Sequence, residues 1–223
     1  MKILVIADME EAALWDYYNP KRTAGVDLIL SCGDLKPKYM EFLLTVVNKP
    51  LLYVRGNHDD RLIEHPPEGC TCIDGRIVER KGLRILGLGG SMRYGPGENM
   101  YSESEMQKRV KKLNRQILKE GGFDIMVTHA PAAGYGDLTD LPHRGFECFN
   151  SLLEVWKPAY LVHGHVHKSY GTGYQKELVH RSGTKIVNAC GHQVIEIDVP
   201  ESAQREKSGS FLYDLYQSMK RKR

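Results

Sequence analysis

The stretch Lys2-Ile3-Leu4-Val5-Ile6-Ala7-Asp8 places a short apolar run directly before a carboxylate. Such a run, rich in Ile, Leu and Val and closed by a polar residue, predicts a strand that is buried on both faces. Five further runs of this kind occupy residues 26–31, 51–55, 84–88, 123–128 and 159–163. Predicted helices lie between several of them, over residues 38–47, 102–119 and 145–156. Strands that alternate with helices predict an α/β domain.

The helix predicted over residues 102–119 has the clearest pattern. Ser102 and Glu105 have the spacing of a capping box, in which each side chain pairs with the backbone N–H of the other residue. An apolar stripe follows on one face, formed by Met106, Val110, Leu113 and Ile117. The other face carries Lys108, Arg109, Lys111, Lys112, Arg115 and Lys119. We interpret this basic face as a solvated helix surface rather than as a phosphate-binding one.

The pattern changes after Lys168. Shorter runs separated by turns, over residues 175–180, 185–189 and 194–199, predict an antiparallel hairpin that completes a sheet. We therefore expect one domain over residues 1–200. The remaining residues, 201–223, form a polar and then basic tail with Phe211, Leu212, Leu215 and Met219 at helical spacing. This tail is expected to be helical and to pack on the domain, to join subunits into an oligomer, or to stay free of both.

Length and composition exclude several classes of protein. The chain has 223 residues, which suits one domain with a real core, and a formal net charge of +3. That charge is far from the strongly basic balance of a dedicated nucleic-acid-binding domain. The apolar runs are much shorter than the about 20 residues that a membrane helix needs, and the N-terminus lacks the pattern of a signal peptide. The five cysteines, an odd number, fit reduced thiols. We expect a cytoplasmic protein without a membrane contact.

The residues that follow five of the predicted strands share one property, since all of them can bind a metal ion. They are Asp8 with Glu10, Asp34, Asn57 with His58, His129, and His165 with His167. Ligands of open α/β sheets bind beyond the carboxyl ends of the strands, so we expect these five ends to converge on one crevice. Each end alone is weak evidence, because a single His or a Gly-Asp pair is more often structural. Their coincidence predicts a metal site.

The same residues fall into five ordered motifs. These are Ala7-Asp8-Met9-Glu10, Gly33-Asp34, Gly56-Asn57-His58-Asp59, Thr128-His129-Ala130-Pro131 and Gly164-His165-Val166-His167. In this order they resemble the motifs of the calcineurin-like metallophosphoesterase superfamily, over residues 1 to 198. Residues 128–137, Tyr170-Gly171 and Val187-Asn188-Ala189 also resemble its compact phosphodiesterase-type branch. The resemblance implies a four-layer α/β/β/α sandwich with two mixed β-sheets.

The resemblance also implies a role for each residue of the site. Asp34 would bridge two divalent ions, Asp8 and His167 would hold the first ion, and Asn57, His129 and His165 would hold the second. Oxygen and imidazole ligands suit Mn, Fe or Zn, with Mg or Ni also compatible. Two such ions, about 3.5 to 4 Å apart, generate a hydroxide at neutral pH and stabilise the phosphoryl oxygens. His58 would protonate the leaving oxygen or stabilise the developing charge.

One motif departs from the usual pattern, because the superfamily has Asp-x-His where this chain has Asp8-Met9-Glu10. Residues two apart on an extended segment face the same side, so Glu10 would reach the same metal as Asp8. Such a site would be harder and would favour Mn, Mg or Fe. The alternative is that Glu10 turns away and leaves the first site weak. His163 is expected to support the ligands rather than to join them.

The expected function is that of a metal-dependent phosphoesterase with a phosphate-ester substrate, cleaving phosphodiesters or small nucleotides. Arg93 and Arg144 are candidates for contacts with the phosphate, because guanidinium groups pair well with phosphate oxygens. Two alternatives remain: a scaffold of this fold that binds partner proteins with little or no activity, and a phosphoprotein phosphatase.

Overall fold

The computed structural model describes residues 1–170 and 174–199 and contains two large mixed sheets. The first sheet has five strands, in the order β13 (Gly191–Glu196), β1 (Lys2–Ala7), β2 (Leu28–Ser31), β3 (Leu51–Tyr53) and β4 (Thr71–Cys72). Strands β1 to β4 run parallel, and β13 is antiparallel to β1. The carboxyl ends of the parallel strands therefore lie at one edge of this sheet.

The second sheet has six strands and is built in the same way. Its order is β11 (Glu177–Val179), β12 (Lys185–Asn188), β10 (Tyr160–His163), β9 (Ile125–Thr128), β6 (Leu83–Leu88) and β5 (Arg76–Arg80). The four inner strands are parallel, and the two edge strands, β11 and β5, are antiparallel to their neighbours. A small separate pair joins β7 (Ser91–Met92) to β8 (Met100–Tyr101).

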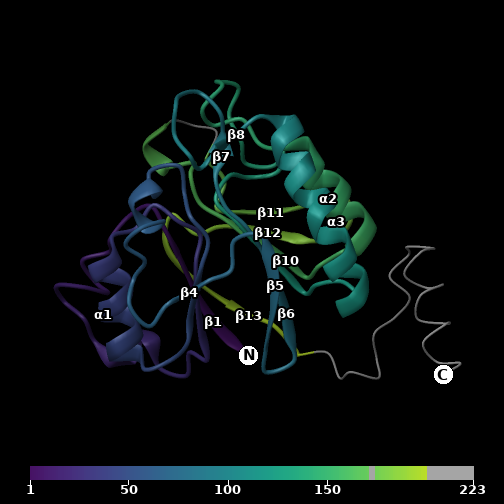
Figure 1. Cartoon of the computed structure of the whole chain (residues 1–223). Helices are drawn as coiled ribbons and strands as arrows, with labels where there is room; N and C mark the ends of the chain where they lie inside the picture. Colours follow the sequence, from purple (N-terminus) through teal and green to yellow (C-terminus); the bar gives the residue numbers. More distant parts are fainter. Residues whose placement is uncertain (171–173, 200–223) are drawn as a thin grey trace, which may run out of the picture.

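The helices cover the outer faces of the two sheets. Helix α1 (Pro37–Val47) lies on one side of the molecule, and α2 (Glu103–Glu120) and α3 (Glu147–Trp156) lie on the other (Figure 1). Short 3₁₀ turns η1 (Pro20–Thr23), η2 (Asp60–Leu62) and η3 (Lys168–Tyr170) occupy connections. Three apolar clusters fill the spaces: one under α1, one between the sheets, and one under α2 and α3. The predicted four-layer α/β/β/α sandwich with two mixed sheets is confirmed.

Most predicted elements occur with small shifts at their ends, but the last part of the chain differs. Strands β11 and β12 form the predicted antiparallel pair. The run that follows does not extend this pair, because β13 crosses over and pairs with β1 of the other sheet, where it buries Ile195 between the sheets. Strand β5 was missed, because its polar sequence Arg-Ile-Val-Glu-Arg lacks a long apolar run.

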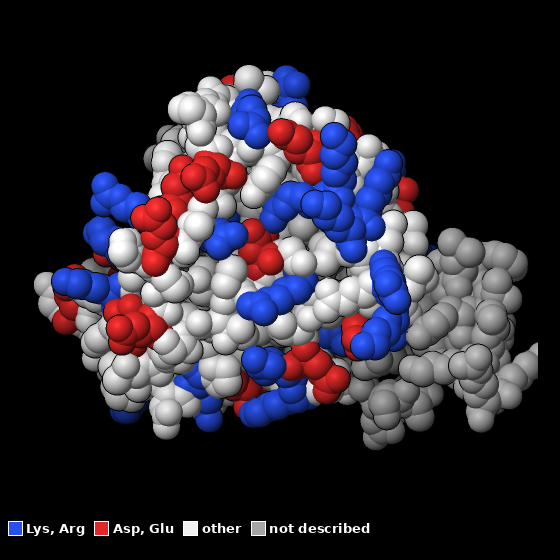
Figure 2. Space-filling view, in the orientation of Figure 1, with Lys and Arg blue, Asp and Glu red and all other residues white. Residues whose placement is uncertain are grey.

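Helix α2 confirms its predicted pattern with one exception. The capping box of Ser102 and Glu105 is formed, and the four stripe residues are buried. Figure 2 shows Lys and Arg side chains gathered over α2, on the predicted basic face. The exception is Arg109, which is mostly buried: its guanidinium donates to Gly89 O at 2.7 Å and pairs with Asp74 at 2.5 Å. Arg109 therefore anchors the helix to the second sheet.

Two predictions concern the environment of the chain. In the described residues no helix is long and apolar enough to cross a membrane. All five cysteines lie in the described part and none forms a disulfide, as predicted. The tail predicted over residues 201–223 lies outside the described residues.

Candidate metal centre

Three of the predicted ligands adopt a backbone conformation that is rare for residues with a side chain. Asp8, Asp34 and His165 have φ angles of 62°, 56° and 68°. They lie in the turns that follow β1, β2 and β10. Left-handed residues other than glycine and asparagine are uncommon and often mark functional sites.

Two glycines make room for the carboxylates. A Cβ atom on Gly56 would lie 2.1 Å from Oδ1 of Asp34, and a Cβ atom on Gly164 would lie 2.6 Å from Oδ2 of Asp8. Both distances are far below van der Waals contact, so the two positions tolerate only glycine. The motifs Gly-Asn-His-Asp and Gly-His-x-His thus need their glycines for the packing of acids from other strands.

Asp59 holds the turn that carries Asp34. Its Oδ2 accepts the backbone N–H of Asp34 at 2.7 Å and that of Gly56 at 2.8 Å. Burial and the nearby charge of Asp34 raise the pKa of Asp59 to about 6. The last residue of the Gly-Asn-His-Asp motif is therefore a positioning group.

His129 is completely buried and points its free nitrogen at two oxygen atoms. Nδ1 donates to Cys32 O at 2.8 Å, which leaves Nε2 facing Asn57 Oδ1 at 2.8 Å and Asp34 Oδ2 at 3.3 Å. Without a metal, burial lowers the pKa of His129, but the attraction of Asp34 outweighs it and raises the pKa to about 9. Burial would likewise raise the pKa of Asp34, but His129 lowers it to about 2. His129 and Asp34 therefore hold a positive charge between them, which is the proton on Nε2 when no metal ion is bound.

The orientation of the Asn57 side chain is set from the opposite side. Its Nδ2 donates to the hydroxyl oxygen of Tyr94 at 2.9 Å, so its Oδ1 is the atom that faces His129. An amide oxygen in this position is a suitable ligand for a divalent ion.

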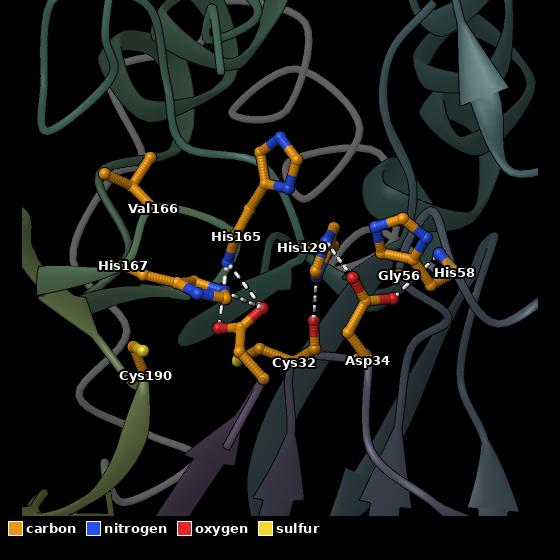
Figure 3. A network of polar contacts seen from close by, with 12 residues as sticks. Cys32, Asp34, Gly56, His58, His129, His165, Val166, His167 and Cys190 are labelled. Carbon is orange, nitrogen blue, oxygen red and sulfur yellow. Dashed lines mark hydrogen bonds and ion pairs between the residues drawn. The ribbon is translucent and has the colours of Figure 1, made fainter. Parts of the chain in front are cut away.

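Asp8 joins the two histidines of the last motif. Both of its oxygens accept the backbone N–H of His165 at 3.0 Å, and Oδ1 lies 3.5 Å from Nε2 of His167. Tyr170 stacks on the His167 ring with centroids 4.8 Å apart. In Figure 3 the His165 ring points away from His167 and Asp34.

The His165 ring is held by a backbone carbonyl. Its Nε2 donates to Pro142 O at 2.8 Å, which leaves Nδ1 as the available donor atom. Burial lowers the pKa of His165 to about 3, so this ring is neutral at physiological pH, as a metal ligand must be. Metal-binding histidines commonly have their other nitrogen fixed by a carbonyl, as both His129 and His165 do.

The donor atoms gather in two groups of three in the described part of the chain. Asp8, Asp34 and His129 form one group, and Asp8, His167 and Cys190 form the other, with all donor atoms of a group within 4.8 Å of one another. The groups share Asp8, whereas the resemblance implies Asp34 as the shared carboxylate. The donor atoms of each group point at a shared place, and the His129 ring is fixed by a backbone carbonyl. Both features fit divalent ions at this site.

The predicted ligand His165 contributes no atom to either group of donors, because its ring is turned toward Pro142 O. Three further predicted residues lie elsewhere. Glu10 pairs with Lys36 at 3.3 Å and belongs to neither group of donors. Arg93 pairs with Glu105 at 3.1 Å. Arg144 is exposed and does not line the large groove beside the donor atoms. The structure therefore does not bring these three side chains to the metal centre.

Sequence reasoning missed Cys190. The motif Val187-Asn188-Ala189 stops one residue short of it, although Cys190 follows the end of β12 just as the other ligands follow their strands. The search for metal-binding residues directly after predicted strands, which found the other ligands, would also have found Cys190. Burial and Asp8 raise the pKa of its thiol to about 12 in the absence of a metal.

A groove of about 1280 Å³ opens beside the donors. Asp8, Asp34, Asn57 and His167 line it together with the exposed His58, whose backbone N–H donates to Oδ1 of Asp34 at 2.9 Å. Its further lining includes the basic residues Lys36, Lys38 and Arg61, the acidic residues Glu41, Glu64 and Glu68, and the aromatic residues Tyr94 and Tyr170. The predicted catalytic histidine is thus accessible to a ligand in the groove.

Comparison with curated proteins finds two nematode relatives. The UPF0046 protein T07D4.2 of Caenorhabditis elegans is 32% identical over 53% of this chain and 28% of its own length. The UPF0046 protein C25E10.12 of the same organism is 29% identical over 74% of this chain and 65% of its own length. The chain thus spans less than two thirds of either relative.

Solved structures and a family model extend the comparison. The crystal structure of TT1561 of Thermus thermophilus matches with a TM-score of 0.56 and 17% identity, over 85% of this chain and 89% of that one. A hypothetical protein from the same organism matches with a TM-score of 0.50 and 18% identity, over 84% and 75%. These likenesses show a shared fold. The model of the calcineurin-like phosphoesterase superfamily domain matches residues 1–193, which include all the motifs and Cys190. The chain therefore belongs to the calcineurin-like phosphoesterase superfamily.

Proposed function

We propose that the protein is a metal-dependent phosphoesterase that binds two divalent ions and cleaves phosphodiesters or small nucleotides. The observation that carries this proposal is the convergence of Asp34, Asn57 and the free nitrogen of His129, which lies 2.8 Å from the amide oxygen and 3.3 Å from the carboxylate. The two oxygen atoms keep a proton on Nε2 in the metal-free protein, and once that proton leaves, the three atoms form a set of lone pairs that one divalent ion can share. Superfamily membership supports the same reading.

When bound, two divalent ions activate water and polarise a phosphoryl oxygen. The chain supplies the remaining functions. His58 reaches the groove next to Asp34 and donates a proton to the oxygen that leaves. Asp59 keeps Asp34 in position through the two backbone N–H groups that it binds. Tyr94 fixes the amide of Asn57, so that its oxygen faces the centre.

The groove supports a small substrate rather than a strand of nucleic acid. Lys36, Lys38 and Arg61 attract phosphate, but Glu41, Glu64 and Glu68 line the same groove and keep its charge mixed. A long polyanion gains little from such a surface, because its binding depends on a continuous positive field. The exposed ring of Tyr94 offers a face on which a base can stack. A compound with one or two phosphates and an aromatic group fits these features.

The test measures hydrolysis of aryl phosphate diesters and monoesters with Mn²⁺ present, together with the metal content of the purified protein. We expect two ions per chain and faster turnover of the diester. His58→Ala should lower kcat roughly 10²–10⁴-fold with both ions retained, because only proton donation is lost. Asp34→Asn should lower both activity and metal content.

Asp16→Asn is the matched control for Asp34→Asn, because Asp16 is exposed and does not line the groove. It should behave as the unaltered protein does. If the protein binds at most one ion and neither ester is cleaved faster than by the His58→Ala and Asp34→Asn variants, the proposal is wrong and the scaffold alternative is favoured.

A further inference from the structure

Cys190 lies where the chain passes from one sheet to the other. It follows β12 of the six-stranded sheet and precedes β13 of the five-stranded sheet. It forms a backbone bridge with Ala7, the last residue of β1, and Asp8 is the next residue along that strand end. The fold therefore fixes the position of the Cys190 thiol relative to the Asp8 carboxylate.

Asn188 fixes Cys190 relative to the histidine motif as well. The buried Asn188 side chain donates from Nδ2 to Val166 O at 2.8 Å and accepts the backbone N–H of Cys190 on Oδ1 at 2.9 Å. Val166 lies between His165 and His167 in the sequence. One amide thus connects the residue that carries the thiol to the loop that carries two predicted ligands.

Three different donor atoms meet as a result. A carboxylate oxygen of Asp8, an imidazole nitrogen of His167 and the sulfur of Cys190 all lie within 4.8 Å of one another. Figure 3 shows the Cys190 side chain beside the His167 ring. Donor atoms around one tetrahedral zinc ion are roughly 3–4 Å apart, so small side-chain movements suffice for these three to share an ion.

The residue expected to complete this group is turned elsewhere. Glu10 forms an ion pair with Lys36 at 3.3 Å and contributes no atom to the group. The first metal position therefore has two of its ligands, Asp8 and His167, and lacks the one that the superfamily's Asp-x-His motif would supply. The sulfur of Cys190 is the atom that the structure places there instead.

We propose that Cys190, as a thiolate, is a ligand of the divalent ion held by Asp8 and His167. The proposal rests on the proposed function only for the presence of a divalent ion at this position. On binding, a sulfur–metal bond forms and the thiol proton passes to solvent, with no change of oxidation state. A thiolate makes the site softer, so it prefers Zn²⁺ to Mg²⁺ or Mn²⁺. This preference is opposite to that of a site completed by Glu10.

The experiment uses the full chain, freed of metal and loaded with Co²⁺. A thiolate bound to Co²⁺ gives a charge-transfer band in the near ultraviolet. We expect this band in the unaltered protein and its loss in Cys190→Ser. The zinc affinity of the first site should fall about 10- to 100-fold or more in that variant, as expected when a group that shapes a metal site is removed.

Two variants serve as controls. Cys70→Ser removes a thiol that is also partly buried but packs against the cluster under α1, and it should keep the band. Glu10→Gln should also keep it, because Glu10 faces Lys36. Absence of the band in the unaltered protein, or its persistence in Cys190→Ser, would overturn the proposal.

A second measurement needs no variant. Zn²⁺ should protect Cys190 from alkylation by iodoacetamide, detected by peptide mass spectrometry, while Cys70 reacts at the same rate with or without Zn²⁺. Equal reaction of Cys190 in both conditions counts against ligation. A Cys190-dependent band without ester hydrolysis would support the ligand and reject the phosphoesterase. Ester hydrolysis with two bound ions but no band would reject the ligand alone.

Discussion

Asp8 and His165 connect the two sheets at the metal centre. Asp8 directly follows β1 of the five-stranded sheet, and both of its carboxylate oxygens accept the backbone N–H of His165 at 3.0 Å. His165 follows β10 of the six-stranded sheet. A charge-assisted hydrogen bond of this kind is among the stronger polar contacts in a protein. The position of the carboxylate therefore depends on how the two sheets pack together.

This relationship makes Gly164 a sensitive position. Gly164→Ala would place a Cβ atom 2.6 Å from Oδ2 of Asp8 and force the carboxylate to move. We expect a loss of metal affinity of about tenfold or more, as for other changes that reorient a ligand. Titration calorimetry on the metal-free protein measures it. Gly95→Ala is the control, because the new Cβ atom would meet only Met100 Sδ at 3.9 Å. Equal metal affinity in the two variants would show that Asp8 does not need its present position.

Metal binding should be coupled to loss of a proton from His129. The pKa of this histidine is raised to about 9 in the metal-free protein by Asp34, so its ring is protonated at neutral pH. A bound ion needs the lone pair on Nε2 and therefore competes with that proton. The affinity of the second ion should weaken about tenfold for each pH unit below 9 and level off above it. Calorimetric titrations between pH 7 and about 10 measure this dependence. An affinity that stays constant over this range would contradict the protonated state of His129.

The sequence predicted which strand ends carry ligands because parallel strands bring their carboxyl ends to one edge. It did not predict the orientation of Glu10, and the reason lies in the backbone of Asp8. The expectation assumed an extended segment, on which residues two apart face the same side. Asp8 instead has a φ of 62°, and the N–H of Met9 donates back to Ala7 O at 2.6 Å. The chain turns at once, so Glu10 faces Lys36.

Two other differences have a different cause, a tertiary contact that local pattern cannot show. Arg93 pairs with Glu105, which a capping box holds at the first turn of α2, and so it is drawn away from the groove. Cys190 reaches Asp8 only because β13 crosses to the other sheet, a pairing between residues almost the whole domain apart in sequence. Burial pattern and motif spacing do not show which residues these two side chains meet, although Cys190 follows the end of a strand as the other ligands do.

The buried His163 should make the protein sensitive to acid. Burial lowers its pKa to about 4, against 6.5 for an unperturbed histidine. The unfolded chain then binds more protons than the folded one between these values, so stability falls as the pH drops from 6.5 to 4. The full effect amounts to roughly 3 kcal/mol.

Urea unfolding of the metal-free protein at several pH values, compared with His163→Asn, isolates this effect from that of other groups. The free energy of unfolding of the unaltered protein should decrease more steeply below pH 6.5 than that of the variant. If the free energy of unfolding depends on pH in the same way in both proteins, His163 is protonated in the folded state or is more accessible to water than the structure indicates.

The ion pair between Arg84 and Asp124 should be the electrostatic contact whose loss costs most stability. Both side chains are buried, and the carboxylate accepts from the guanidinium at 2.6 and 3.0 Å and from the backbone N–H of Arg84 at 2.8 Å. Asp124→Asn leaves a buried guanidinium without its counter-charge, which costs about 3–5 kcal/mol of unfolding free energy. Asp27→Asn is the control, because its pair with Lys81 is exposed and should contribute far less. Asp124 immediately precedes β9, which carries His129 at its other end, so the variant should also bind the second ion more weakly. Equal urea midpoints for the two variants would show that the buried pair contributes no more than the surface one.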